Sequence, residues 1–328
     1  MAVLSIDQAG PMCSVQDAGR QGFQRFGVTP AGVMHPQAAA LCWQLLGRQN
    51  HPLIEVSAPG LMLRCDAPVS VSFVWQGRVE REGVAVANQA GRLSLAAGEG
   101  LRLHPSPAQW GYLGIHADYC AEPLMGSYAT HARSELKVFD PLSAGASIEI
   151  APWPLDAELT GLKGLAPTSD PIRLLAGPQI ARFSEAQIAQ FTETDWRIGH
   201  RSDRMAYQLE GPPLSLAGNH DIVSDGITFG AIQITGSGQP YVLMADRQPT
   251  GGYPKIGCII AADLGRFSAL PPGSQVQFAW VDLAAAQAAA HAEAAELHAA
   301  MRVDQPDFRS ERLLGLNLVD GVVNAKYN

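Results

Sequence analysis

Charged residues are scarce in this chain of 328 residues. Aspartate, glutamate, lysine and arginine make up only 16% of it, whereas hydrophobic residues make up 47%. A soluble protein carries most of its charge on its surface, so this balance predicts an extensive interface buried against a partner or a second copy. The net charge of -8, the isoelectric point near 5.6 and the lack of a basic stripe argue against nucleic acid or an anionic membrane as the main partner.

Several short signals are missing as well. No apolar stretch reaches transmembrane length, and the first residues lack the basic segment and longer apolar run of a signal peptide, so we expect a cytoplasmic protein. The five cysteines are dispersed, without any C-x-x-C spacing, which predicts reduced and mostly buried thiols. Neither the H-E-x-x-H zinc motif nor the G-x-x-x-x-G-K-[ST] phosphate loop is present. We therefore predict no metal site, and any ATP use must depend on another phosphate cradle, shared with a partner.

Short strands dominate what is present. Residues 69–75 and 276–282 alternate between apolar and other side chains, which is typical of strands with one buried face. Further short apolar segments are bounded by glycine, proline or serine, at 101–104, 112–115, 172–175, 231–234 and 241–244. These patterns predict a mainly β protein, with strands spaced as in β-barrels rather than in a parallel sheet.

Three segments have helical character. Residues 36–46 begin with proline and are followed by Gly47, the usual asymmetry of helix ends. Residues 183–191 form a shorter helix with Ser184 as N-cap. The alanine-rich segment 283–301 predicts a C-terminal helix.

Prolines and glycines without sustained periodicity mark a boundary at residues 151–170. We predict two tandem β-barrel domains over 1–155 and 168–283, followed by a helix and tail over 284–328. The tail contains the apolar run 313–319, which needs cover from the body or from a partner.

The segment 243–257 is the clearest indication of a site. It begins as an apolar strand and opens into the loop 246–254, where an acid, a guanidinium and an amide precede two glycines. Glycines accept positive φ and let a ligand approach the backbone. The segment 16–27, with Asp17 and Arg20, is a weaker match to the same pattern and indicates two related halves of the chain.

A series of motifs follows in order along residues 10–283. They are Val15-Gln16-Asp17-Ala18-Gly19-Arg20-Gln21-Gly22, Gly47 with Leu53-Ile54-Glu55, Gly126-Ser127 with Thr130, Gly177-Pro178-Gln179, Ser202-Asp203-Arg204-Met205, Leu209-Glu210-Gly211, Gly230-Ala231-Ile232-Gln233 and the loop 245–254. In this combination the chain resembles the carboxyltransferase-like family shared by the C subunit of 5-oxoprolinase, the antagonist of the sporulation kinase inhibitor, and the second allophanate-hydrolase-type region of urea carboxylase.

The resemblance implies two cyclophilin-like β-barrel domains with few short helices, and a related B-type partner subunit. In 5-oxoprolinase, the B and C subunits look like an ATP-dependent activating module, and an A-type subunit then completes the hydrolysis of 5-oxo-L-proline to glutamate. In the urea carboxylase relatives, the corresponding region helps move a carboxyl group from carboxybiotin to urea. Both substrates present an amide or urea carbonyl.

Activating such a carbonyl requires groups that stabilise charge on its oxygen, and arginine binds carboxylate, phosphate or a polarised carbonyl in a bidentate manner. We predict catalytic roles for Arg204 and Arg247 with the adjacent Asp203 and Asp246. The predicted substrate-binding residues are Asp17, Arg20, Gln233, Gln248, Thr250, Gly251, Gly252 and Tyr253. For the Asp–Arg neighbours, an internal ion pair that holds a loop is the alternative interpretation.

The chain also departs from the family pattern. His35 stands where Gly-Ala-Met-Asp usually ends in aspartate, Ala117-Asp118 replaces a Gly-Gly pair, and Ala206 replaces a glycine after Arg-Met. Most departures fall in the first half, which puts the function of the N-terminal site residues in question.

Three functions remain open. The first is a subunit of an ATP-dependent 5-oxoprolinase-type hydrolase, favoured because the sequence lacks the fused biotin carboxylase and carrier regions of urea carboxylase. The second is a carboxyltransferase subunit that acts on urea or a similar small amide and requires a separate biotinylated carrier. The third is a non-catalytic regulatory binder of a kinase-inhibitor partner.

Overall fold

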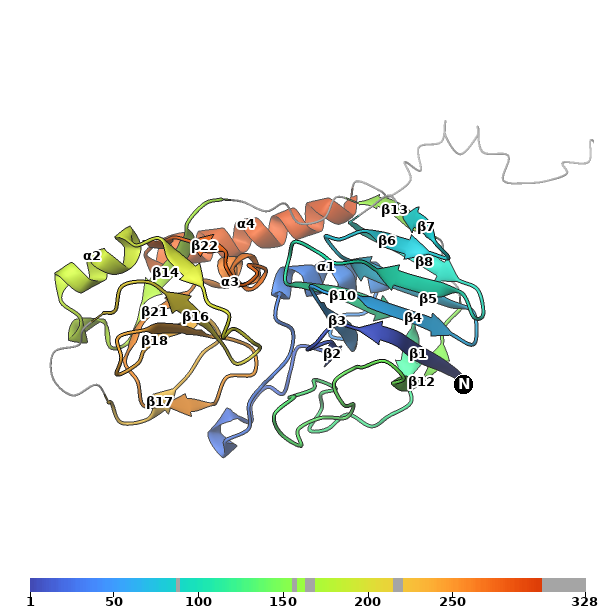
Figure 1. Ribbon diagram of the computed structural model, residues 1–328, viewed down its shortest axis with the longest axis horizontal. Helices are drawn as coiled ribbons and strands as arrows, with labels where there is room; N and C mark the ends of the chain where they lie inside the picture. The colour runs from blue at the N-terminus through green and yellow to red at the C-terminus, as the bar shows by residue number, and fades with distance from the viewer. Residues whose placement is uncertain (87–88, 155–157, 163–168, 215–220, 303–328) are drawn as a thin grey trace, which may run out of the picture.

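The protein is described here by a computed structural model that covers residues 1–86, 89–154, 158–162, 169–214 and 221–302. Two β units lie side by side, and helix α4 (Leu283–Arg302) runs along both of them (Figure 1). Helix α4 packs against α1 (Pro36–Leu46) of the first unit and α3 (Ala261–Ser268) of the second. This architecture confirms the predicted mainly β fold class with few helices.

The first unit consists of two antiparallel sheets around one core. Their strand orders are β11-β12-β1-β4-β9-β6-β7 and β13-β8-β5-β10-β3-β2. The strands are β1 (Ala2–Ala9), β2 (Ser14–Gln16), β3 (Leu53–Ser57), β4 (Leu61–Cys65), β5 (Val69–Val74), β6 (Val79–Arg81), β7 (Val84–Val86), β8 (Ala90–Leu95), β9 (Gly100–Leu103), β10 (Trp110–Ile115), β11 (Ala117–Tyr119), β12 (Ser147–Pro152) and β13 (Leu159–Leu162). Helix α1 packs on β5 and β10 of the second of these sheets. Strand β13 pairs with β8, so a strand beyond residue 155 belongs to the first unit.

The second unit is an eight-stranded sheet in the order β22-β15-β16-β19-β18-β21-β14-β23. Its strands are β14 (Ile172–Ala176), β15 (Trp196–Ile198), β16 (Ala206–Glu210), β18 (Ala231–Ile234), β19 (Pro240–Leu243), β21 (Lys255–Ile259), β22 (Gln275–Val276) and β23 (Phe278–Trp280). The two ends of this order, β22 and β23, are separated in sequence only by Gln277. One stretch of chain therefore pairs with β15 on one side and β14 on the other, which closes the sheet into a barrel.

Smaller elements complete the second unit and the junction between the units. A two-stranded ribbon pairs β17 (Asp225–Gly226) with β20 (Thr250–Gly251). Two short 3-10 helices are η1 (Gln24–Phe26) and η2 (Ile180–Arg182), and the remaining helix is α2 (Glu185–Glu193).

The three predicted helices are present, although α2 begins and ends two residues later than predicted. Helix α1 is capped by His35, whose Nδ1 accepts a hydrogen bond from the backbone N–H of Ala38, and it ends at Gly47 in the left-handed conformation. Ser184 and Gln187 form a capping box at α2. Helix α4 spans the predicted alanine-rich segment.

Helix α3 is not anticipated by the sequence. It is short and contains Gly265, which disfavours a helix interior. The glycine is required by packing, because a Cβ there would overlap Gln37 Oε1 and the His35 ring of the first unit. Tertiary contact between α1 and α3 thus overrides the local preference.

Among the helices that the structure describes, none is long and apolar enough to cross a membrane. The predicted linker residues 163–167 and the apolar run 313–319 lie outside the described part of the chain.

Candidate functional site

Loops from the two β units meet at a junction that contains several predicted site residues. The Thr29 hydroxyl of the first unit donates to the backbone oxygen of Arg247 at 2.8 Å. The His131 ring lies 3.3 Å, through Nε2, from the backbone oxygen of Asp246. The two halves of the sequence therefore contribute to one continuous set of contacts.

Arg204 is the centre of an ion-pair network at this junction. Its guanidinium binds Asp246 in a bidentate manner, with Nη2 to Oδ1 at 2.8 Å and Nε to Oδ2 at 3.1 Å. It also binds Glu55 of the first unit and the backbone oxygen of Gly32. Burial alone would lower the pKa of Arg204, but Asp246 and Glu55 outweigh it and raise the pKa. Most of the Arg204 donors are thereby engaged within the protein.

Glu55 extends this network into the first sheet. Its Oε2 accepts hydrogen bonds from the Tyr112 hydroxyl at 2.6 Å and from the backbone N–H of Met34 at 2.7 Å. Tyr112 in turn accepts from the backbone N–H of His35 at 2.8 Å. Burial raises the pKa of Glu55, although Arg204 opposes that shift. This carboxylate locks the start of α1 to the second unit.

Arg20 is the opposite case to Arg204. The residue is fully buried, yet Nε, Nη1 and Nη2 have no hydrogen-bond partner in the described part of the chain. Burial lowers the pKa of Arg20, and the nearby carboxylates of Asp17 and Asp246 oppose this. A buried cation without hydrogen bonds is costly, on the order of several kcal/mol, unless an anion accompanies it. Arg20 is therefore the predicted arginine whose donors remain available for an anionic group.

Asp17 holds the loop that carries Arg20. Its Oδ1 accepts from the backbone N–H of Gly19 at 2.8 Å and from the Ser127 hydroxyl at 2.6 Å. Its Oδ2 accepts from the backbone N–H of Tyr128 at 2.7 Å. These three bonds fix the loop against the segment that follows β11, so the carboxylate serves the position of its neighbour.

Arg247 is buried and bound by backbone carbonyls rather than by carboxylates. Its Nε donates to the oxygen of Ile227 at 3.2 Å, and its Nη1 to those of Met244 and Ala245 at 3.3 and 3.4 Å. The guanidinium also lies over the Phe229 ring, 5.8 Å from its centroid. Burial lowers the pKa of Arg247 to about 10. These contacts tie the turn after β19 to the neighbouring loop.

Asp203 closes a turn and reaches across the junction. Its Oδ1 accepts from the backbone N–H groups of Met205 and Ala206 at 2.7 and 3.3 Å. Its carboxylate also forms an ion pair with the exposed side chain of Arg133 in the first unit.

The remaining predicted residues gather elsewhere, around the β17–β20 ribbon. Gly251 lies close enough to the Gln233 amide that a Cβ would meet Nε2 at 2.7 Å. Gln233 Nε2 is 3.4 Å from the backbone oxygen of Tyr253, and Gly252 accepts from the backbone N–H of Ile222 at 2.7 Å. The exposed members are Gln248, Thr250 and Tyr253. The structure thus divides the predicted residues into a junction group and a ribbon group.

Two charged residues were not predicted as site residues, although Glu55 is part of a quoted motif and Lys255 lies in the segment 243–257. Glu55 and Lys255 are both buried on strands, at β3 and at the start of β21. A single charged residue inside an otherwise apolar strand is unusual, because burying a charge requires a partner. That signal was available in both segments.

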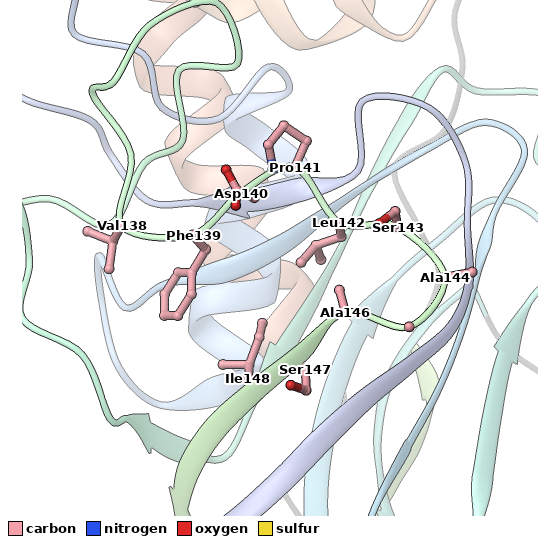
Figure 2. A pocket seen from close by; sticks show the side chains of 11 residues that line it. Val138, Phe139, Asp140, Pro141, Leu142, Ser143, Ala144, Ala146, Ser147 and Ile148 are labelled. Atoms are coloured by element: carbon pink, nitrogen blue, oxygen red, sulfur yellow. The ribbon is translucent and has the colours of Figure 1, made fainter.

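The other candidate features do not coincide with these residues. A cavity of about 520 Å³ is lined by the single segment 138–148, and Figure 2 shows its side chains around the loop before β12. None of the predicted site residues lines it. Asp118, which lies where the family pattern has glycine, pairs with exposed Arg48. Across the described residues, no cluster of three or more His, Cys, Asp or Glu side chains is placed to hold a metal ion.

Comparison with known proteins finds relatives that match most of this chain. The C subunit of 5-oxoprolinase from Escherichia coli (strain K12) is 30% identical over 294 residues, which cover 84% of this chain and 90% of that protein. Its counterpart of the same name from Haemophilus influenzae is 32% identical over 278 residues, with 82% and 88% covered. The crystal structure of K. lactis urea amidolyase has the same fold, with a TM-score of 0.80, 22% identity and 91% of this chain covered. The match spans only 20% of that larger chain.

The family model described as "Carboxyltransferase domain, subdomain A and B" matches residues 26–280, which include most of the first β unit and the second unit, but not the segment with Asp17 and Arg20. The chain therefore belongs to the carboxyltransferase domain family of subdomains A and B.

Proposed function

We propose that this chain is a subunit of an ATP-dependent 5-oxoprolinase-type complex and activates the lactam carbonyl of 5-oxoproline for hydrolysis to glutamate. The observation that carries this assignment is the similarity to two 5-oxoprolinase C subunits over most of both chains. The similarity is not confined to one β unit, because it covers 84% and 82% of this chain.

Arg20 is the proposed anchor of the substrate at the junction. 5-Oxoproline carries a carboxylate beside its lactam, and a guanidinium with free donors binds carboxylate in a bidentate manner. In a buried site of low dielectric, such a charge-assisted bond is stronger than at the surface. The same donors would stabilise negative charge that develops on a reacting carbonyl oxygen.

The other junction residues mainly hold the two units, loops and turns of the site in place. Arg204, Asp246 and Glu55 hold the two units together, and Asp17 fixes the Arg20 loop. Arg247 and Asp203 shape the turns on the second unit. The ribbon residues Gln233, Gln248, Thr250, Gly251, Gly252 and Tyr253 form the other part of the proposed substrate-binding region.

The proposed activity also requires partner subunits and an ATP site. We propose a B-type paralogous subunit as its partner and an A-type subunit that completes hydrolysis. ATP is a substrate of the assembly, and its site is shared with the partner, because the sequence contains no phosphate-loop motif. The fold shared with urea amidolyase favours one alternative, a carboxyltransferase that moves a carboxyl group from carboxybiotin to urea or a similar small amide.

The test is ATP-dependent release of glutamate from 5-oxoproline by this chain co-expressed with B-type and A-type subunits from the same cell. Glutamate formation that requires all three chains and ATP is expected. A well-folded complex that hydrolyses ATP but forms no glutamate would contradict the assignment. In that case, bicarbonate-dependent carboxylation of urea with a biotinylated carrier is the assay for the alternative.

A further inference from the structure

A second buried cation whose charged group has no hydrogen-bond partner among the described residues lies on the outer side of the second barrel, near the β17–β20 ribbon. Lys255 opens β21 and faces Gln233 of β18 directly across the antiparallel pair. Opposed residues on neighbouring strands point to the same side of a sheet, and the next residue, Ile256, belongs to the barrel core. Lys255 and Gln233 are both only 3% exposed. Their side chains therefore share one enclosed polar region outside the barrel wall.

The Lys255 ammonium has more donors than partners. Its Nζ lies 3.2 Å from Asp225 Oδ2 and makes no well-formed hydrogen bond to any residue that the structure describes. Gln179 holds the strand, because its Oε1 accepts from the backbone N–H of Lys255 at 3.1 Å. Its amide nitrogen reaches the same Asp225 oxygen at 3.5 Å. An ammonium and an amide thus converge on a single carboxylate.

That carboxylate lies on the small β17–β20 ribbon of the second unit. Asp225 is on a strand of two residues that pairs with Gly251 and Thr250, and half of its side chain, 52%, is exposed. Lys255 lowers the pKa of Asp225 and so favours its ionised form. Backbone hydrogen bonds from Ile222 to Gly252 and from Ile227 to Pro249 hold the ribbon on both flanks. Asp225 is therefore a half-exposed side-chain carboxylate on a surface ribbon, whereas Lys255 is buried in a barrel strand.

We propose that Lys255 and Gln179 form a binding site for a terminal anionic group, a carboxylate or a phosphoryl group, and that the side chain of Asp225 occupies it until such a ligand displaces that side chain. The side-chain carboxylate of Asp225 has the chemistry that the site selects. Gln233, whose amide lies against Gly251, is the neutral donor next to the entering group. The site is separate from Arg20 but borders the ribbon part of the proposed substrate-binding region, so it rests on that part of the proposed function; the binding experiments below are decided independently of glutamate formation.

The first experiment compares the full chain with Asp225→Asn by isothermal titration calorimetry. The probes are inorganic phosphate, ATP and 5-oxoproline, so the responding probe distinguishes a phosphoryl from a carboxylate ligand. Removing the competing charge should tighten binding of at least one probe by about tenfold. The substitution is at a half-exposed position and should not prevent folding. Equal affinities in both proteins for every probe, or no binding by D225N, would overturn the proposal.

The second experiment asks whether Lys255 is the receiving group. K255M is introduced into D225N, and Lys137→Met serves as the matched control, because Lys137 also pairs with an aspartate, Asp140, but in the first unit. Binding should be lost in D225N/K255M and retained in D225N/K137M. Circular dichroism verifies that each variant is folded. Binding that persists in folded D225N/K255M would refute the site, and if K255M does not fold, the D225N titration decides alone.

Discussion

Two loops of similar composition, one from each β unit, place their arginines in opposite environments. In the first, Arg20 is fully buried with no hydrogen-bond partner among the described residues. In the second, Arg247 is bound by three backbone carbonyls, and nearby Arg204 by two carboxylates and a carbonyl. An arginine whose donors are engaged contributes to stability, whereas one without partners is able to bind a ligand. The sequence pattern alone does not distinguish the two.

The largest expected effect is on catalysis, upon substitution of Arg20. Arg20→Met should lower kcat/KM for 5-oxoproline in the assembled complex by about a thousandfold, or ~4 kcal/mol, because a buried charge-assisted contact is lost. The free energy of unfolding should fall little, since replacing an unpartnered buried cation with an apolar side chain removes a desolvation cost. Steady-state kinetics and urea denaturation measure the two quantities.

Arg25→Met is the matched control for that prediction, because Arg25 is exposed and lies on the same loop. It should keep wild-type kinetics. If R20M also retains wild-type kcat/KM, the ligand role of Arg20 is wrong.

A large loss of stability is expected at Arg204. Arg204→Met would leave Glu55 and Asp246 buried without their cation, so the free energy of unfolding should fall by at least about 3 kcal/mol. Chemical denaturation checks the value. A loss below about 1 kcal/mol would show that the network does not hold the two units together.

His35, one of the departures from the family pattern, should make stability depend on pH. Burial lowers the pKa of His35 to about 4 from its ordinary 6.5, so the unfolded chain takes up a proton at higher pH than the folded one. The free energy of unfolding should therefore be highest above pH 6.5 and fall by about 3 kcal/mol as the pH drops from 6.5 to 4.

His35→Asn preserves an N-cap side chain for α1 and removes this titration. Unfolding measured across the same pH range should show a flatter dependence for the variant. Parallel curves for the two proteins would mean that His35 is not the responsible group.

A smaller effect is expected when Arg247 loses its carbonyl contacts. Arg247→Met should lower the free energy of unfolding by about 2 kcal/mol, because three buried carbonyls lose a donor. The comparison of the two loops predicts that R247M affects stability more than kcat/KM, the reverse of R20M. A variant of normal stability but without activity would transfer the ligand role to Arg247.

The smallest effect is expected at the exposed ion pair across the junction. Arg133→Met removes the partner of Asp203, whose carboxylate keeps its turn hydrogen bonds. Exposed ion pairs contribute about 0–1 kcal/mol, so denaturation curves should nearly coincide with those of the wild type. A loss comparable to that of R204M would indicate that the junction depends on surface charge.

Much of the fold was predictable from local patterns. The alternation in residues 69–75 became β5, and the capping signals at Ser184 and Gly47 mark real helix ends. The segment 276–282 was predicted as one strand, but it is divided at Gln277 into β22 and β23, which pair with different neighbours. Barrel closure depends on pairing between strands that are far apart in the sequence. The hydrophobic periodicity of a single segment does not reveal which strands pair.

The sequence by itself determined the family, the mainly β class, the presence of α1, α2 and α4, and the residue types from which a site can be built. The tertiary structure decided which buried cations keep hydrogen-bond donors available for a ligand. Arg204 received carboxylates from two units and Arg247 received carbonyls from adjacent turns, whereas Arg20 received neither from the residues that the structure describes. Lys255 was placed against Asp225 by strand register and a short ribbon. The physical reason is that a buried charge depends on its neighbours in space, which come from residues far apart in the sequence.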